Sequence, residues 1–190
     1  MIKLIYDGLS IDGDKVVYNS NSDSDSDIMN TIEPEIYKSE FGGNVYYFGY
    51  AFKDSTSRKD RTTIIRWIKG LGQDVADSSS VKNMIDKALL YFDKNVNISD
   101  ISCIVYTRSG RSSLTNTIIR ELGNFSQRDT IKTAIEDERS KEVIKSIQSG
   151  KILIVDDINT SGSTLNEIIR IIRKINNQCE IYIFTLIGKE

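Results

Sequence analysis

The chain has 190 residues, of which 39% are hydrophobic and 27% are charged, a composition typical of a globular protein with a sizeable core. Its 25 Lys and Arg residues against 27 Asp and Glu leave a net charge of −2, which argues against a protein that binds nucleic acid through its overall charge. The absence of histidine excludes Ser-His-Asp and Cys-His catalysis and histidine-ligated zinc.

The two cysteines, Cys103 and Cys179, lie in apolar segments and form no CxxC motif, so we predict buried, reduced thiols. No segment approaches the ~20 consecutive apolar residues that a transmembrane helix needs. The first apolar run ends at Asp7, which is too early for a secretory signal peptide. These features predict a soluble, cytoplasmic protein with no membrane partner.

The first half of the chain contains short predicted elements without a regular alternation. The expected strands and helices span residues 2–6, 15–18, 45–52, 61–69 and 80–92. Asn19–Asp27 carries alternating aspartates, but the glycine and glutamate that an EF-hand calcium loop requires are missing. We therefore expect a solvated loop there.

Two clusters in this half have both a structural and a functional interpretation. Six of the 16 aromatic residues lie between Phe41 and Phe52, and a half-buried strand explains them more simply than base stacking does. Between Arg58 and Lys69, five basic residues accompany one acidic residue. A solvated surface is favoured there over a site for diphosphate, an anionic substrate or RNA.

The second half alternates strands and helices regularly. The expected strands span 101–106, 152–155 and 181–187, and the expected helices span 113–122, 139–148 and 164–174. The strands are continuously apolar and the helices carry one apolar stripe, a pattern typical of a parallel sheet covered on both faces. We therefore predict an α/β protein with a twisted, mainly parallel sheet, and we expect ligands at the carboxyl ends of its strands.

The most informative segment runs from Ile152 to Leu165, ILIVDDINTSGSTL. An apolar strand ends in two carboxylates, Asp156 and Asp157, and a loop of small residues then opens into a helix. The helix start offers unpaired N–H groups and a positive dipole end to a phosphate, and Gly162 permits close backbone approach. The carboxylates suit ribose hydroxyls or, through water, a magnesium ion.

Two other interpretations of this segment are weaker. An ordinary strand–turn–helix with a Ser or Thr cap needs only part of the combination. The acidic pair could also end a Walker B strand, but GxxxxGK[ST] does not occur in the chain, which excludes a P-loop NTPase.

The segment closely resembles the 5-phosphoribosyl-1-diphosphate (PRPP) binding motif of the type I phosphoribosyltransferases, in which two acidic residues and a short spacer precede Thr-Thr/Ser-Gly-Thr/Ser-Thr. The order of helices and strands extends the resemblance over residues 98–190. It implies a phosphoribosyltransferase-like core at 98–190 and an irregular α+β hood at 1–97 that selects the acceptor, in one compact unit. Ile183–Gly188 also resembles the last strand of the ComF-like branch, although the cysteines and proline-rich features of that branch are missing.

The resemblance implies a role for each matching residue. Asp156 and Asp157 would be the catalytic carboxylates, binding the ribose hydroxyls and contacting a Mg²⁺ ion held mainly by PRPP and water. The 5′-phosphate and ribose would also contact Asn159, Thr160, Ser161, Gly162, Ser163 and Thr164. The diphosphate would be bound by the loop after the first core strand, at Arg108, Ser109, Gly110 and Arg111.

A flexible loop that closes over PRPP would occupy Asn124–Arg139. Its basic residues, Arg128, Lys132 and Arg139, have acidic neighbours. We therefore weigh equally that they cover the diphosphate and that they face solvent.

The reaction that the resemblance implies is transfer of the 5-phosphoribosyl group from PRPP to a nitrogen acceptor, such as a nucleobase, with release of diphosphate and Mg²⁺ as cofactor. This would belong to nucleotide metabolism, with small molecules as partners and a homodimer left open. The alternative is a regulatory protein of the same fold that senses PRPP or a nucleotide with reduced catalysis. An RNA-binding module has little support from the net charge of −2.

Overall fold

The computed structural model describes residues 9–12, 15–18, 32–38, 44–52, 57–59, 61–62, 65, 79–107, 113–125, 131–159 and 161–188. The strand expected at 2–6, the aspartate-rich segment 19–27 and most of the helix expected at 61–69 lie outside these residues. A short antiparallel hairpin is formed by β1 (Leu9–Asp12) and β2 (Lys15–Tyr18).

The larger sheet has six strands in the order β3-β4-β8-β7-β5-β6. Their bounds are β3 Ile32–Lys38, β4 Val45–Phe52, β5 Ile101–Tyr106, β6 Ile131–Ala134, β7 Lys151–Ile158 and β8 Glu180–Ile187. The edge strand β3 runs antiparallel to β4, and every other neighbouring pair is parallel. This confirms the predicted α/β fold with a mainly parallel sheet.

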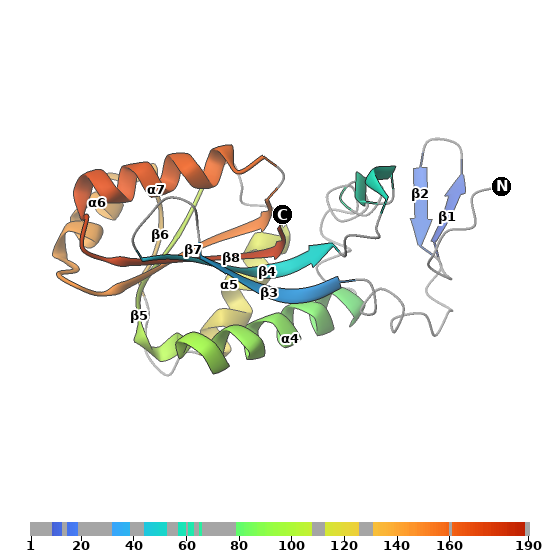
Figure 1. Ribbon diagram of the computed structural model, residues 1–190, viewed down its shortest axis with the longest axis horizontal. Coiled ribbons are helices and arrows are strands. Elements are labelled where there is room, and N and C mark those ends of the chain that lie inside the picture. Colours follow the sequence, from blue (N-terminus) through green and yellow to red (C-terminus); the bar gives the residue numbers. More distant parts are fainter. Residues whose placement is uncertain are drawn as a thin grey trace.

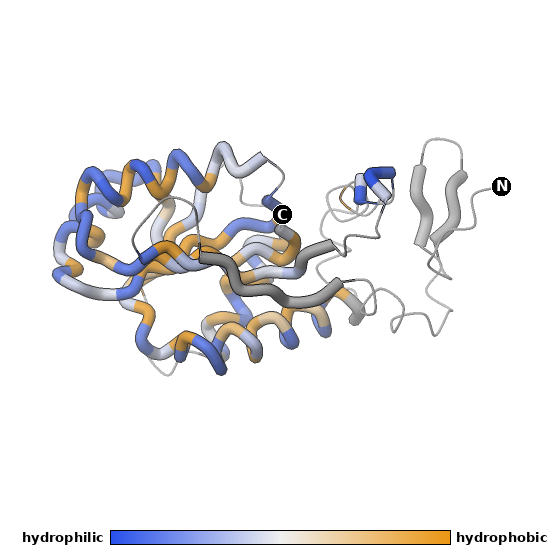
Figure 2. The backbone as a smooth tube through the Cα atoms, in the orientation of Figure 1, coloured by the Kyte–Doolittle hydropathy of each residue, from blue (hydrophilic) through white to orange (hydrophobic). Residues whose placement is uncertain are grey.

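Helices cover both faces of this sheet (Figure 1). One face packs against α4 (Ser79–Val96) and α5 (Ser113–Phe125), and the other against α6 (Glu138–Ser146) and α7 (Ser163–Ile175). A short 3-10 helix, Ile98–Asp100, leads into β5. Hydrophobic and hydrophilic residues alternate along α7 (Figure 2), because an apolar stripe recurs at helical spacing and faces the sheet.

The core between the sheet and α4 is rich in aromatic side chains. Phe48 of β4 meets Phe92 edge to face, with ring centroids 4.7 Å apart, and Phe92 lies 6.0 Å from Phe184 in the same manner. Tyr46 stacks on Tyr182 at 5.0 Å. The aromatic residues described in β4 are therefore packed in the sheet, as the structural interpretation of this cluster predicts.

The core between the sheet and α7 is mainly aliphatic. The predicted stripe of α7 is buried there, with Leu165, Ile168, Ile169 and Ile172 all in contact with the strands. Cys103 and Cys179 are free and buried in the same core, which confirms the prediction for both thiols. Burial raises the pKa of the Cys103 thiol to about 12.

Two strands of the sheet were not expected. β6 lies inside the segment 124–139, so that segment is not one continuous loop: residues 131–134 pair in parallel with β5, and its ends belong to α5 and α6. Lys132 therefore belongs to an edge strand rather than to a closing loop. Four residues with a central lysine carry too short a pattern to identify, and β3 is obscured by Pro34 and two glutamates, a composition that edge strands tolerate.

The first half of the chain contributes to the same sheet as the second. β4 pairs directly with β8, and α4 packs against both. The division into a hood at 1–97 and a core at 98–190 stays a prediction. No helix in the described part of the chain is long and apolar enough to cross a membrane.

Candidate active site

The predicted acidic pair lies at the carboxyl end of β7, near the middle of the sheet. Asp156 and Asp157 are half-buried, and the ladder to β8 continues past them, pairing Asp156 with Thr185 and Ile158 with Ile187. The Asp157 N–H donates to Asp156 Oδ1 at 2.9 Å, and the Ile158 N–H donates to Asp157 Oδ1 at 2.6 Å. Each carboxylate thus accepts the backbone N–H of the next residue along a paired strand.

The loop after β7 turns directly into α7. Gly162 is the N-cap residue with φ 73°, in the left-handed region that favours glycine, and its carbonyl accepts the Asn166 N–H at 2.8 Å. The hydroxyls of Ser161 and Ser163 are hydrogen-bonded to each other at 2.9 Å. Ser161, Ser163 and Thr164 are exposed, and the Ser163 N–H donates to Ser161 Oγ at 3.4 Å. Hydroxyls at the start of α7 are therefore open to solvent, as an anion site requires.

The whole predicted diphosphate site, Arg108, Ser109, Gly110 and Arg111, falls outside the described residues. The same holds for Thr160 of the loop and for Arg128 of the segment before β6. Thr107, which immediately precedes the predicted diphosphate loop, is buried at the end of β5. Because β5 and β7 are neighbouring parallel strands, their carboxyl ends lie at the same edge of the sheet.

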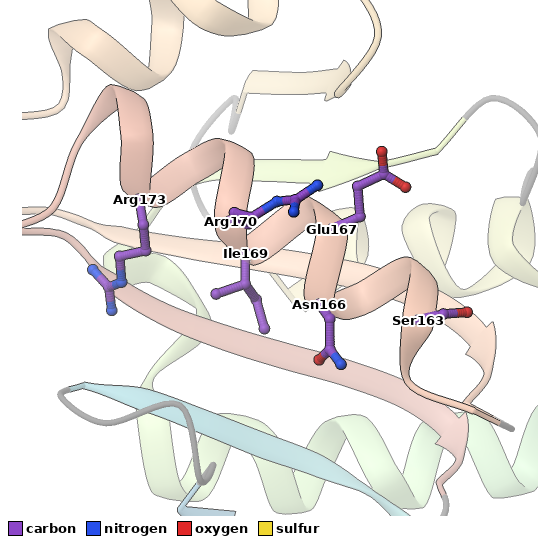
Figure 3. A pocket seen from close by; sticks show the side chains of 6 residues that line it. All are labelled: Ser163, Asn166, Glu167, Ile169, Arg170 and Arg173. Carbon is purple, nitrogen blue, oxygen red and sulfur yellow. The ribbon is translucent and has the colours of Figure 1, made fainter.

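A surface pocket of about 550 Å³ lies along α7 (Figure 3). It is lined by Ser163, Asn166, Glu167, Ile169, Arg170 and Arg173. The Arg173 guanidinium donates to the backbone carbonyls of Cys179 at 2.6 Å and Asn177 at 3.2 Å, so this arginine links the helix to the turn before β8. Of the residues predicted to contact the 5′-phosphate, 159–164 (the phosphate loop), only Ser163 lines this pocket.

One buried side chain at this edge has no counterpart in the sequence prediction. The hydroxyl of Tyr47, from β4, is hydrogen-bonded to Thr185 Oγ1, and the Asn159 side chain is its second polar partner. Burial raises the pKa of Tyr47 to about 12, and the negative charge of Asp156 adds to that effect. This contact depends on how β4 aligns with β8, which no pattern within β4 reveals.

The residues available for a metal ion are the two aspartates. Within the described part of the chain, no three or more His, Cys, Asp or Glu side chains gather closely enough to hold a metal. Two adjacent carboxylates fit a Mg²⁺ ion that takes its other oxygen ligands from a substrate and water.

Comparisons with known proteins bear on the same segment. A family model described as phosphoribosyl transferase domain matches residues 93–190, which include β7, the loop and α7. Among solved structures, the chain is similar to the HGPRT-ase from Leishmania tarentolae, crystallised in complex with GMP, with 18% identity over 62% of this chain and 69% of that chain and a TM-score of 0.39. No curated protein sequence matches the chain.

Proposed function

This chain belongs to the phosphoribosyl transferase domain family, and from that premise we propose that it transfers the 5-phosphoribosyl group from PRPP to a nitrogen acceptor such as a nucleobase. The observation that carries the proposal is the segment from Ile152 to Leu165. It combines a buried strand, two half-buried carboxylates and a solvent-facing loop at the start of α7. Each part suits one part of a phosphorylated ribose.

In the proposed reaction, the lone pair of the acceptor nitrogen forms a bond to C1′ of the ribose. The bond between C1′ and the diphosphate oxygen breaks, and its electron pair leaves with diphosphate. The proton of the acceptor nitrogen passes to solvent. Because positive charge develops on the ribosyl group while diphosphate departs, the protein has mainly to position the reactants and balance charge.

The proposed role of Asp156 and Asp157 is to bind the ribose hydroxyls. Their backbone hydrogen bonds, at 2.9 and 2.6 Å, orient the carboxylates before any ligand arrives. An oriented acceptor loses less conformational freedom on binding than a mobile one does. Carboxylates facing the ribose also place negative charge where the ribosyl group becomes positive.

The proposed role of the loop is to hold the 5′-phosphate. Gly162 has no side chain with which to cap α7, and the Ser163 N–H makes a long hydrogen bond of 3.4 Å to Ser161 Oγ, which a phosphate can replace. The exposed hydroxyls of Ser161, Ser163 and Thr164 add donors around it. We propose Asn159 and Thr160 as further contacts, and Arg108, Ser109, Gly110 and Arg111 as the diphosphate site.

Mg²⁺ is the proposed cofactor, because it would neutralise charge on the departing diphosphate. Asp156 and Asp157 would approach the ion directly or through water. This fits a chain whose described residues offer a carboxylate pair rather than a complete ligand cage.

The test is a calorimetric titration of PRPP with and without Mg²⁺, comparing the wild type with the double variant Asp156→Asn/Asp157→Asn. We expect Mg²⁺-dependent binding that the double variant loses, with its circular dichroism unchanged. Glu167→Gln is the matched control, since it removes an exposed carboxylate on α7. Equal affinities of the wild type and the double variant for PRPP would contradict the site.

A panel of purine and pyrimidine bases then separates a transferase from a sensor. Release of diphosphate when one base is added supports the transferase and identifies its acceptor. Mg²⁺-dependent PRPP binding without turnover on any base supports the sensor of the same fold instead.

A further inference from the structure

Tyr47 reaches the candidate site from outside the family-matched segment. On the backbone it pairs with Ile183 of β8, yet its hydroxyl is hydrogen-bonded to Thr185, two residues nearer the carboxyl edge. The side chain therefore lies along the sheet toward the end of β7. Only 7% of the residue is exposed.

Two glycines leave the space that the Tyr47 phenol occupies. A Cβ atom at Gly188 would lie 1.9 Å from the Tyr47 hydroxyl oxygen and 2.5 Å from Cζ. A Cβ atom at Gly49 would lie 2.5 Å from the Thr185 carbonyl oxygen, where the register between β4 and β8 shifts. A side chain at either glycine would collide with Tyr47 or Thr185. The position of the Tyr47 hydroxyl therefore depends on a glycine in β4 and on one just after β8.

The hydroxyl joins β8 to the beginning of the phosphate loop. Its first partner, Thr185, is fully buried and is the strand neighbour of Asp156. Its second partner, Asn159, is the first residue after β7, and the Asn159 N–H donates to Ile187 O at 2.9 Å. The Asn159 Oδ1 atom lies 3.8 Å from the position of a Cβ at Gly162. The contacts thus run from β8 through Tyr47 to Asn159, whose side chain lies beside Gly162 at the start of α7.

The buried phenol suits a permanent hydrogen-bonding role. Its pKa of about 12 keeps the proton on the oxygen at neutral pH, so the hydroxyl can donate one hydrogen bond and accept another. A buried hydroxyl without partners would be costly, which ties Tyr47, Thr185 and Asn159 into one arrangement.

We propose that Tyr47 is a positioning residue for the phosphate loop: by holding the Asn159 side chain against β8, its hydroxyl keeps Asn159 and residues 161–163 in the conformation that receives a phosphate. The identity of that phosphate, the 5′-phosphate of PRPP, rests on the proposed function. Tyr47 itself touches no reacting atom.

Tyr50 provides a matched control on the same strand. It is fully buried, its pKa is also raised to about 12 by burial, and its hydroxyl donates to the Met84 carbonyl at 3.0 Å on α4, across the opposite face of the sheet. Tyr47→Phe and Tyr50→Phe each remove one buried hydroxyl and leave the ring in place. They differ in whether that hydroxyl contacts the loop.

The first experiment needs no ligand. Backbone hydrogen exchange in the peptide covering 158–164 should become ~5- to 10-fold faster in Tyr47→Phe, the effect of losing one hydrogen bond, and should stay unchanged in Tyr50→Phe. Unchanged exchange in Tyr47→Phe, or equal acceleration in both variants, overturns the positioning role whatever the protein binds.

The second experiment measures affinity for ribose 5-phosphate, which carries the phosphate without diphosphate. We expect Tyr47→Phe to bind it ~5- to 10-fold more weakly than Tyr50→Phe does. A double-mutant cycle with Asn159→Ala should show that the two losses are not additive; additive losses would contradict action through Asn159. A wild type that binds neither ribose 5-phosphate nor PRPP overturns the proposed function, and the exchange result still decides the positioning role.

Discussion

The two faces of the sheet are packed with different kinds of side chain. Toward α4, the core is built from interlocking rings, and Phe92 alone contacts Phe48, Tyr182 and Phe184. Toward α7, the core is mainly aliphatic, and at the carboxyl edge of the sheet it contains the buried hydroxyls of Tyr47 and Thr185.

The difference follows from what each face must bury. Polar groups below the surface need partners at fixed distances, whereas apolar groups need only volume. The aromatic cluster on the α4 face can therefore serve stability alone. The α7 face has to hold a polar arrangement beside the acidic pair, and four substitutions or conditions test that contrast.

The largest effect is expected on the α4 face. Phe92→Ala should lower the free energy of unfolding by about 3–5 kcal/mol, since it removes a fully buried ring from an aromatic cluster. Urea unfolding measures this, and ribose 5-phosphate affinity at low urea should stay unchanged. Leu90→Ala, at a side chain 57% exposed on the same helix, serves as control with a change within about 0.5 kcal/mol. A Phe92→Ala cost below that of the control would refute the contrast.

On the α7 face, Gly188→Ala should cost about 1–3 kcal/mol, because the new methyl group would collide with the Tyr47 hydroxyl. Thermal unfolding measures the loss. The cost should shrink in a Tyr47→Ala background, where the hydroxyl and the ring carbons Cζ and Cε1 are all gone. An identical cost in both backgrounds would mean that the collision lies elsewhere.

Gly162→Ala should cost about 1–2 kcal/mol for a different reason. Among the described residues other than its chain neighbours, no atom lies nearer than 3.8 Å to a Cβ there, but φ is +73°, which alanine adopts only with strain. Asparagine tolerates this conformation better, so Gly162→Asn should be less destabilised in the same melt. Equal destabilisation by the two residues would exclude backbone strain as the cause.

Alkaline pH should affect both faces alike and by the smallest amount. The unfolded tyrosines ionise near pH 10 and the buried Tyr47 and Tyr50 near 12, so their contribution is complete below pH 10 and is lost as pH rises toward 12. Each should contribute at most about 1.4 kcal/mol per pH unit in that window. Urea unfolding at pH 9, 10 and 11 should show shallower slopes in Tyr47→Phe and Tyr50→Phe than in the wild type; unequal slopes would mean that burial is not the common cause.

The parts of the fold predicted from sequence are those encoded locally. The stripe of α7, including Leu165 and Ile172, repeats at helical spacing and is buried as expected. The strand that ends in Asp156 and Asp157 is a continuous apolar run. In both cases a few neighbouring residues contain the whole signal.

The parts that sequence did not reveal depend on pairing between distant strands. β6 is four residues long and exists because β5 offers it an edge. In the sequence, Tyr47 is one aromatic residue among several. Only the register between β4 and β8 shows that its hydroxyl contacts Thr185. The roles of the acidic pair and the loop stay predictions until ligand binding is measured.

The pairing of Val45 with Ile181 also has a consequence for synthesis on the ribosome. At ~5–20 residues per second, the interval between these two residues is on the order of ten seconds. During that time β4 has no parallel partner, and an aromatic strand with an open edge is a template for association with other chains. We therefore expect the nascent chain to be prone to association until β8 emerges, so that coexpressed chaperones should raise the soluble yield.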